Sequence, residues 1–156
     1  MEYNGFIFIG LIKVKDEPYV IEYNVRMGDP ETEVVFPRIK SDVLELFLAL
    51  GTEGFALLNL EIDQRFTSTV MLVSGGYPLA YQKNFPIIGL NDINESLVFH
   101  AGTKNENNRT LTNGGRVLAI TSFGETLKKA TENCYREIKK ISFKEMYYRK
   151  DIGFDL

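Results

Sequence analysis

Two neighbouring stretches near the start of the chain carry apolar residues in the pattern of β-strands. Phe6 to Val14 and Tyr19 to Met27 both concentrate Ile, Val, Phe and Tyr, which favour extended backbone. The residues between them, Lys15 to Pro18, are polar and end in a proline, as is typical of turns. We therefore predict an antiparallel hairpin with a four-residue connection.

A short helix is predicted after the sharp turn at Gly28-Asp29-Pro30. Apolar residues recur at helical spacing from Val43 to Leu50, and Ser41 stands before them as a candidate N-cap. Gly51 follows them, and glycine commonly ends helices. This helix is expected to close a first unit.

The second half of the chain begins with strands separated by turns. One alternating stretch ends at Gly75-Gly76-Tyr77-Pro78, where glycine and proline force the chain to turn. The polar stretch from Gly102 to Gly115 is predicted to be a long loop. The predicted strands are Thr67 to Ser74, Leu97 to Ala101 and Arg116 to Ser122.

The apolar spacing then changes to that of a helix. Between Leu127 and Ile141 apolar residues recur every three or four positions, with charged residues between them, which predicts one long amphipathic helix. Ser122 and Glu125 have the spacing of a capping box at its start. Cys134, the only cysteine, lies among the apolar positions and is predicted to be buried.

Clustered strands followed by a single long helix indicate an α+β fold rather than a doubly wound one. The chain has 156 residues, of which 44% are apolar, and this is enough to build a folded core. We predict two domains, residues 1–56 and residues 57–156, the second of which is β-rich and carries the long helix.

Charge and composition narrow the classes of function. The net charge is -3 with 18 basic residues, so the sequence lacks the cationic surface that nucleic acid or anionic lipid attracts. Neither nucleic acid nor a membrane is an expected partner. No apolar run reaches the roughly 20 residues that span a bilayer, and the start of the sequence lacks the pattern of a signal peptide. A cytoplasmic location is expected.

The candidate chemistry lies in the second predicted strand. Because side chains alternate along a strand, Glu22, Asn24 and Arg26 are predicted to share one face. A carboxylate and an amide oxygen about 7 Å apart, twice the rise per residue, can reach one hard cation such as Mg²⁺. The guanidinium of Arg26 suits a phosphate or a carboxylate. The turn that follows leaves Asp29 and Glu31 near the same end of the strand. A solvated strand face shows the same alternation, so alternation alone leaves both interpretations open.

This stretch resembles the signature of a known family. The run Glu22-Tyr23-Asn24-Val25-Arg26-Met27-Gly28-Asp29-Pro30-Glu31-Thr32 is similar to the Glu-(Phe/Tyr)-Asn-Val-Arg-Phe-Gly-Asp-Pro-Glu-Thr run of phosphoribosylamine–glycine ligases, and departs from it mainly at Met27. Asn84 stands where the family usually has Gly, and residues 105–108 resemble an insertion. Four later segments are similar to later blocks of the family, in the same order and at comparable spacing: Gly75 to Pro78, Val98 to Thr103, Asn113 to Leu118 and Tyr148 to Gly153.

The resemblance implies the end of an ATP-grasp lobe followed by a small β-rich C-terminal domain with one long helix. It also implies an ATP-dependent carboxylate–amine ligase of de novo purine biosynthesis. Such an enzyme joins glycine to 5-phosphoribosylamine and gives glycinamide ribonucleotide, ADP and phosphate. By position, Glu22 and Asn24 would be ligands of a Mg²⁺ or Mn²⁺ ion that bridges the ATP phosphates. Arg26, Asp29 and Glu31 would face the glycine, the acyl phosphate or the ribosylamine.

The expected partners are therefore small molecules, namely ATP, glycine and 5-phosphoribosylamine. A further expected partner is the N-terminal part of a longer parent enzyme, because family members carry a first domain and most of the ATP-grasp there. We expect this chain to be inactive alone. Two alternatives are a non-catalytic β-rich module that presents Gly102 to Gly115 to another protein, and an ATP-grasp ligase for another small carboxylate. The segment from Arg26 to Glu31 favours the glycine ligase.

Two further residues are weaker candidates. His100, the only histidine, could contact substrate or transfer a proton, but a hydrogen-bonded, semi-buried histidine on an apolar strand is the favoured interpretation. Arg116 follows Gly114 and Gly115, which could hold a phosphate, although a hairpin turn explains both glycines without any ligand.

Overall fold

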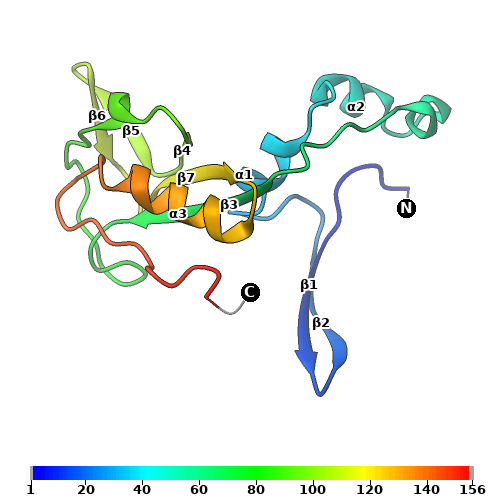
Figure 1. The fold of residues 1–156 in the computed structure, drawn as a ribbon, viewed down its shortest axis with the longest axis horizontal. Helices are drawn as coiled ribbons and strands as arrows, with labels where there is room; N and C mark the ends of the chain where they lie inside the picture. The colour runs from blue at the N-terminus through cyan, green and yellow to red at the C-terminus, as the bar shows by residue number, and fades with distance from the viewer. Residues whose placement is uncertain (1, 155–156) are drawn as a thin grey trace. The chain divides into compact units, whose positions relative to one another are not determined.

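The structure is a computed structural model that describes residues 2–154, and the chain divides into two compact units between Asp63 and Gln64. Figure 1 labels the helices and strands of both units. The predicted α+β fold is confirmed, because both units combine strands with helices. Among the described residues, no helix is long and apolar enough to cross a bilayer.

The first unit begins with the predicted hairpin, made of β1 (Phe8–Val14) and β2 (Glu17–Asn24). Its connection is shorter than predicted, because only Lys15 and Asp16 lie between the strands. Their φ angles are 50° and 69°. Two residues in the left-handed region make the tight turn whose twist matches that of paired strands. The next two residues therefore belong to β2 rather than to the loop.

A β-bulge interrupts the pairing of β1 with β2. Gly10 pairs with Glu22, whereas the next residue of β1 pairs with Val20, so Ile21 is an extra residue on β2. The bulge lies on the N-terminal side of Glu22. The alternation of the strand is therefore intact from Glu22 to Asn24, and these two side chains share a face.

The predicted helix of the first unit is present, but it is capped by Asp42 rather than by Ser41. The Asp42 carboxylate accepts hydrogen bonds from the N–H groups of Leu44 and Glu45, at 2.8 and 3.2 Å. The Ser41 hydroxyl instead accepts a hydrogen bond from the N–H of Glu61. Both residue types cap helices well, so spacing alone could not separate them. The helical segments of this unit are α1 (Thr32–Val35), η1 (Phe36–Arg38), α2 (Val43–Ala49) and η2 (Glu53–Leu57).

The second unit is built on a three-stranded antiparallel sheet in the order β3-β7-β4. These strands are Phe66–Val73, Arg116–Gly124 and Leu97–His100, close to the predicted ranges. The predicted long helix is α3 (Leu127–Ile138), which packs on β3 and β7 (Figure 1). A short 3-10 turn, η3 (Leu90–Asp92), precedes β4.

The core of the second unit lies between this sheet and α3. Its fully buried side chains come from β3, β7 and the helix, and include Val70, Leu72, Leu118, Ile120, Cys134 and Ile138. The predicted burial of Cys134 is confirmed. Burial raises the pKa of its thiol, which keeps the thiol protonated and unreactive at neutral pH.

Two predictions for the second unit are wrong. The stretch from Gly102 to Gly115 is not a loop but contains a hairpin, β5 (Thr103–Glu106) and β6 (Arg109–Thr112). Its turn consists of two asparagines, residues 107 and 108, with φ angles of 51° and 57°, and asparagine tolerates that region better than most residues. The start of α3 is capped by Thr126, which accepts from the N–H of Lys129, and not by the predicted Ser122 and Glu125 pair.

Candidate functional site

The candidate site of the first unit lies on the face of β2 that carries Glu22 and Asn24. The Glu22 side chain is exposed, whereas Asn24 is half-buried. The Asn24 Nδ2 atom is buried and has no hydrogen-bond partner among the residues that the structure describes. A buried amide without a partner is costly. This NH₂ group is available to donate to an acceptor atom of a ligand, whereas a cation would bind the amide oxygen, Oδ1.

Gly10 lies opposite Glu22 across the hairpin. A Cβ atom added at Gly10 would lie 3.0 Å from Glu22 Cγ. Glu22 Cγ thus lies beside the space that a side chain at Gly10 would occupy.

Arg26 does not continue the row of Glu22 and Asn24. Strand β2 ends at Asn24, so the predicted extension of the strand to Met27 is wrong. The Arg26 guanidinium donates to the carbonyl oxygen of Met27 at 3.1 Å and is exposed. Its assignment to a phosphate or carboxylate stays a prediction.

The turn that follows brings Glu31 back onto Gly28. The backbone of Gly28 is buried, and a Cβ atom there would overlap the Glu31 carboxylate. The Gly28 carbonyl oxygen accepts hydrogen bonds from the hydroxyl and the N–H of Thr32, at 2.6 and 3.0 Å. These bonds hold the turn in which the exposed Asp29 lies, and α1 begins directly after Glu31.

Sequence reasoning missed one polar group in this stretch. Glu33, in the first turn of α1, has a buried Oε2 atom without a hydrogen-bond partner among the described residues. An unpartnered carboxylate oxygen is more costly to bury than a neutral one. The clue available in the sequence was its place directly after the family-like run, in a segment otherwise rich in apolar residues.

The residues of this face fit a hard cation in chemical type. Mg²⁺ prefers oxygen ligands and usually keeps water and substrate phosphates in its shell, so one carboxylate and one amide are a sufficient protein contribution. No cluster of three or more His, Cys, Asp or Glu side chains suited to a metal occurs within residues 2–154. A cation held at Glu22 and Asn24 would need further ligands beyond these two side chains.

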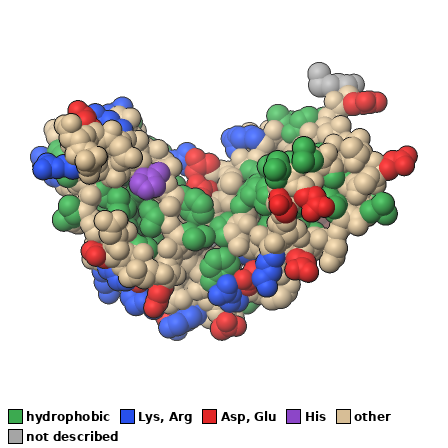
Figure 2. All heavy atoms as spheres, turned by 90° about the horizontal axis from the view of Figure 1, so that it is seen from above, with side chains coloured by type: hydrophobic (Ala, Val, Ile, Leu, Met, Phe, Trp, Pro, Cys, Tyr) green, Lys and Arg blue, Asp and Glu red, His purple; other side chains and the backbone are tan. Residues whose placement is uncertain are grey.

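The weaker candidates lie in the second unit. His100 ends β4, and its Nδ1 atom lies 3.0 Å from the Thr103 hydroxyl. The predicted hydrogen bond is confirmed, but the side chain is exposed rather than semi-buried, as its purple atoms in Figure 2 illustrate.

Arg116 is the first residue of β7 and is half-buried. The glycines before it serve packing: a Cβ atom at Gly115 would overlap the Tyr77 ring, and Gly114 packs against Gly102. These contacts account for both glycines through close backbone approach, where the sequence favoured a hairpin turn.

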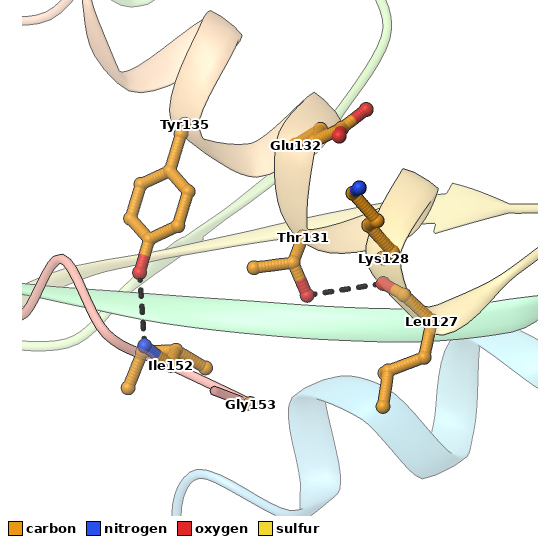
Figure 3. A pocket seen from close by; sticks show the side chains of 7 residues that line it. All are labelled: Leu127, Lys128, Thr131, Glu132, Tyr135, Ile152 and Gly153. Carbon is orange, nitrogen blue, oxygen red and sulfur yellow. Dashed lines mark hydrogen bonds between the residues drawn. The ribbon is translucent and has the colours of Figure 1, made fainter. Parts of the chain in front are cut away.

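A pocket of the second unit, shown in Figure 3, contains none of the predicted site residues. It has a volume of ≈ 310 Å³ and lies between α3 and residues 152–153. The Tyr135 hydroxyl accepts from the N–H of Ile152 at 3.1 Å and donates to the carbonyl oxygen of Arg149 at 3.0 Å. Tyr135 of α3 thus holds residues 149–152 against the helix by two hydrogen bonds.

The segment that contains the β1–β2 hairpin matches a known protein family model. Residues 1–32 match the family model described as "Phosphoribosylglycinamide synthetase, ATP-grasp (A) domain", so the class of this segment is the ATP-grasp proteins. Residues 67–155 match the model described as "Phosphoribosylglycinamide synthetase, C domain", which spans more than half of the chain. The chain belongs to the phosphoribosylglycinamide synthetase family, as the resemblance in the sequence indicated.

Curated relatives carry the same name as the resemblance. A phosphoribosylamine–glycine ligase of Caldanaerobacter subterraneus is 43% identical over 97% of this chain, and one of Fusobacterium nucleatum is 43% identical over 98%. The crystal structure of phosphoribosylamine–glycine ligase from Thermotoga maritima matches with a TM-score of 0.74, at 35% identity over 93% of this chain. The chain spans 36%, 37% and 36% of the lengths of these three proteins.

Proposed function

We propose that this chain contributes the metal-binding face and the C-terminal domain of an ATP-dependent ligase that joins glycine to 5-phosphoribosylamine. The products are glycinamide ribonucleotide, ADP and phosphate, as in de novo purine biosynthesis. The observation that carries the proposal is the shared face of Glu22 and Asn24 on β2, which presents a carboxylate and an amide oxygen together.

Glu22 and Asn24 are the proposed ligands of Mg²⁺ or Mn²⁺. When bound, such a cation neutralises charge on the ATP phosphates. Arg26 offers a guanidinium to a substrate phosphate or carboxylate. Asp29 and Glu31 offer carboxylates that accept hydrogen bonds from an amine. In this scheme the residues act by binding and orienting the substrates, which is how enzymes of phosphoryl transfer obtain most of their rate.

The domain assignment, residues 1–56 and 57–156, also stays a proposal. In it, the first segment is the C-terminal part of the ATP-grasp domain and the second is the C-terminal domain of the synthetase. The match of residues 1–32 to the ATP-grasp model and of residues 67–155 to the C-domain model supports it.

A chimeric enzyme tests the proposed function. The matching part of the Fusobacterium nucleatum relative is replaced by this chain, and glycine-dependent ADP release is measured with 5-phosphoribosylamine. We expect an active chimera, and we expect Glu22→Gln to lower kcat/KM at least about 100-fold, because loss of a residue that only supports a metal ligand already costs about 10–100-fold. The matched control is Glu17→Gln, an exposed carboxylate at the other end of β2.

Two results would contradict the proposal. One is a Glu22→Gln chimera with the rate of the unsubstituted chimera. The other is a chimera that uses a different small carboxylate in place of glycine.

A further inference from the structure

Gly10 occupies a strand position that does not need glycine for its backbone. It lies inside β1, and its φ angle is outside the left-handed region. Glycine in the interior of a strand weakens the strand, and it often marks a close approach of another group. A contact that only glycine permits would explain its presence here.

That contact is with Glu22. A Cβ atom at Gly10 would meet Glu22 Cγ at 3.0 Å, and its next nearest neighbours would be Glu22 N and Phe8 Cε1, both at 3.7 Å. Two of the three nearest atoms thus belong to Glu22, and only the contact with its side chain is too short for an ordinary Cβ. A Cβ atom at this position would require Glu22 Cγ to shift by a few tenths of an ångström.

The bulge at Ile21 lies beside the same pair. It changes the register between the Gly10–Glu22 pair and the next pair, and bulges commonly redirect a side chain near functional sites. A backbone feature on β2 and an open space on β1 thus both act on the orientation of Glu22.

We propose that Gly10 is a positioning residue for Glu22: it leaves the space beside Glu22 Cγ, and so sets the direction in which the carboxylate is presented to a divalent cation. This inference rests on the proposed function, in which Glu22 is a metal ligand. Substitution by alanine leaves the hairpin in place, because the exposed Glu22 side chain is free to move aside. The substitution is therefore expected to weaken metal binding without unfolding the strand pair.

Binding of Mn²⁺ to the chimeric ligase that carries this chain tests the inference, because the rest of the enzyme is present there. Mn²⁺ is titrated in the presence of ATP, and the paramagnetic broadening of the backbone amide signals of residues 20–24 is followed by NMR. We expect Gly10→Ala to raise the apparent Kd for Mn²⁺ about tenfold, the lower range for residues that orient a metal ligand. Cross-strand contacts between β1 and β2, measured by NOE, should be unchanged.

Two variants serve as references. Gly54→Ala makes the same chemical change in the first unit, where the added Cβ would meet only Thr52 Oγ1 at 3.4 Å, and it should bind Mn²⁺ as the unsubstituted chimera does. Glu22→Gln removes the proposed ligand itself and should abolish the broadening.

The outcomes separate the inference from the proposed function. A Gly10→Ala chimera with unchanged Kd overturns the inference and leaves the role of Glu22 intact. Loss of the cross-strand NOE signals in Gly10→Ala also overturns it, because Gly10 would then be required for folding rather than for positioning. Equal broadening in Glu22→Gln and in the unsubstituted chimera, or none in either, contradicts the proposed function, and the inference fails with it.

Discussion

The two units bury their apolar residues to very different degrees. In the second unit, Leu72 of β3 and Leu118 of β7 are 0% exposed, whereas in the first unit Ile21 and Tyr23 of β2 are 65% and 67% exposed. Within the described part of the first unit, Gly28 is the only buried residue. Both units contain strands of similar length and apolar content, so strand propensity alone does not decide whether a core forms.

What separates the units is the presence of a covering layer. Helix α3 lies on β3 and β7 and covers one face of that sheet, whereas within residues 2–154 β1 pairs with β2 alone. A two-stranded hairpin by itself is at most marginally stable in water. The second unit therefore has the means to hold its fold through its own packing, and the hairpin of the first unit does not.

The largest expected difference between the units is in hydrogen exchange. Backbone amides of β7 should exchange at least about 1000-fold more slowly than those of β1 and β2, which corresponds to about 4 kcal/mol of opening free energy. Exchange followed by NMR or mass spectrometry measures both sets in one sample. Equal protection of the two sets would show that the hairpin is as stable as the sheet and would remove the contrast.

A pair of identical substitutions sharpens the contrast further. Ile120→Ala in β7 should lower the free energy of unfolding of the second unit by about 2–5 kcal/mol, because it leaves a cavity in a sealed core. Ile21→Ala in β2 removes an exposed side chain and should cost less than about 1 kcal/mol. Urea unfolding monitored for each unit gives both values, and similar costs would contradict the assignment of the core.

The smallest expected effect concerns a buried carboxylate at the edge of that core. Glu137 of α3 is 1% exposed. Burial raises its pKa, but hydrogen bonds from Lys140 Nζ at 2.8 Å and from the N–H groups of Asn94 and Glu95 outweigh this, and the net pKa is lowered from 4.5.

A lowered pKa means that Glu137 stabilises the fold above the ordinary glutamate pKa and loses this effect as the pH falls through its folded-state pKa. Glu137→Gln should therefore cost about 1–3 kcal/mol at neutral pH, and the cost should shrink below about pH 4. The exposed Glu132, which pairs with Lys129 at 3.7 Å, supplies the control Glu132→Gln, with a cost below about 0.5 kcal/mol. A cost for Glu137→Gln that stays constant with pH would contradict this account.

Periodic patterns allowed most elements of the fold to be predicted. The helical spacing from Leu127 onward identified α3, and the alternation near Val70 identified β3. These signals are local and repeat over several turns or residues. The exact residue that caps a helix was harder to predict. Asp42 and Ser41 are both suitable N-caps, and only the path of the backbone determines that Asp42 caps α2.

The hairpin between Gly102 and Gly115 shows a different limit. Its two strands have only four residues each and are mostly polar, so no alternation of apolar residues indicated strands. The two asparagines at its centre were the available signal, because a pair of residues that both tolerate positive φ favours a tight turn.

For the candidate site, alternation placed Glu22 and Asn24 on one face but could not locate the end of β2 or the bulge at Ile21. The contact of Glu22 with Gly10 joins residues on different strands, and its geometry depends on register. Register is a property of paired backbones, so one strand read alone does not contain it.

The approach of Gly102 to Gly114 has a consequence for how this sequence is free to vary. A Cβ atom at Gly102 would lie 2.6 Å from the Cα atom of Gly114, and one at Gly114 would lie 2.9 Å from the Cα atom of Gly102. In most tight contacts, growth of one residue can be offset by shrinkage of the other. Here neither glycine has a side chain that could become smaller. A larger residue at one position therefore cannot be accommodated by a substitution at the other.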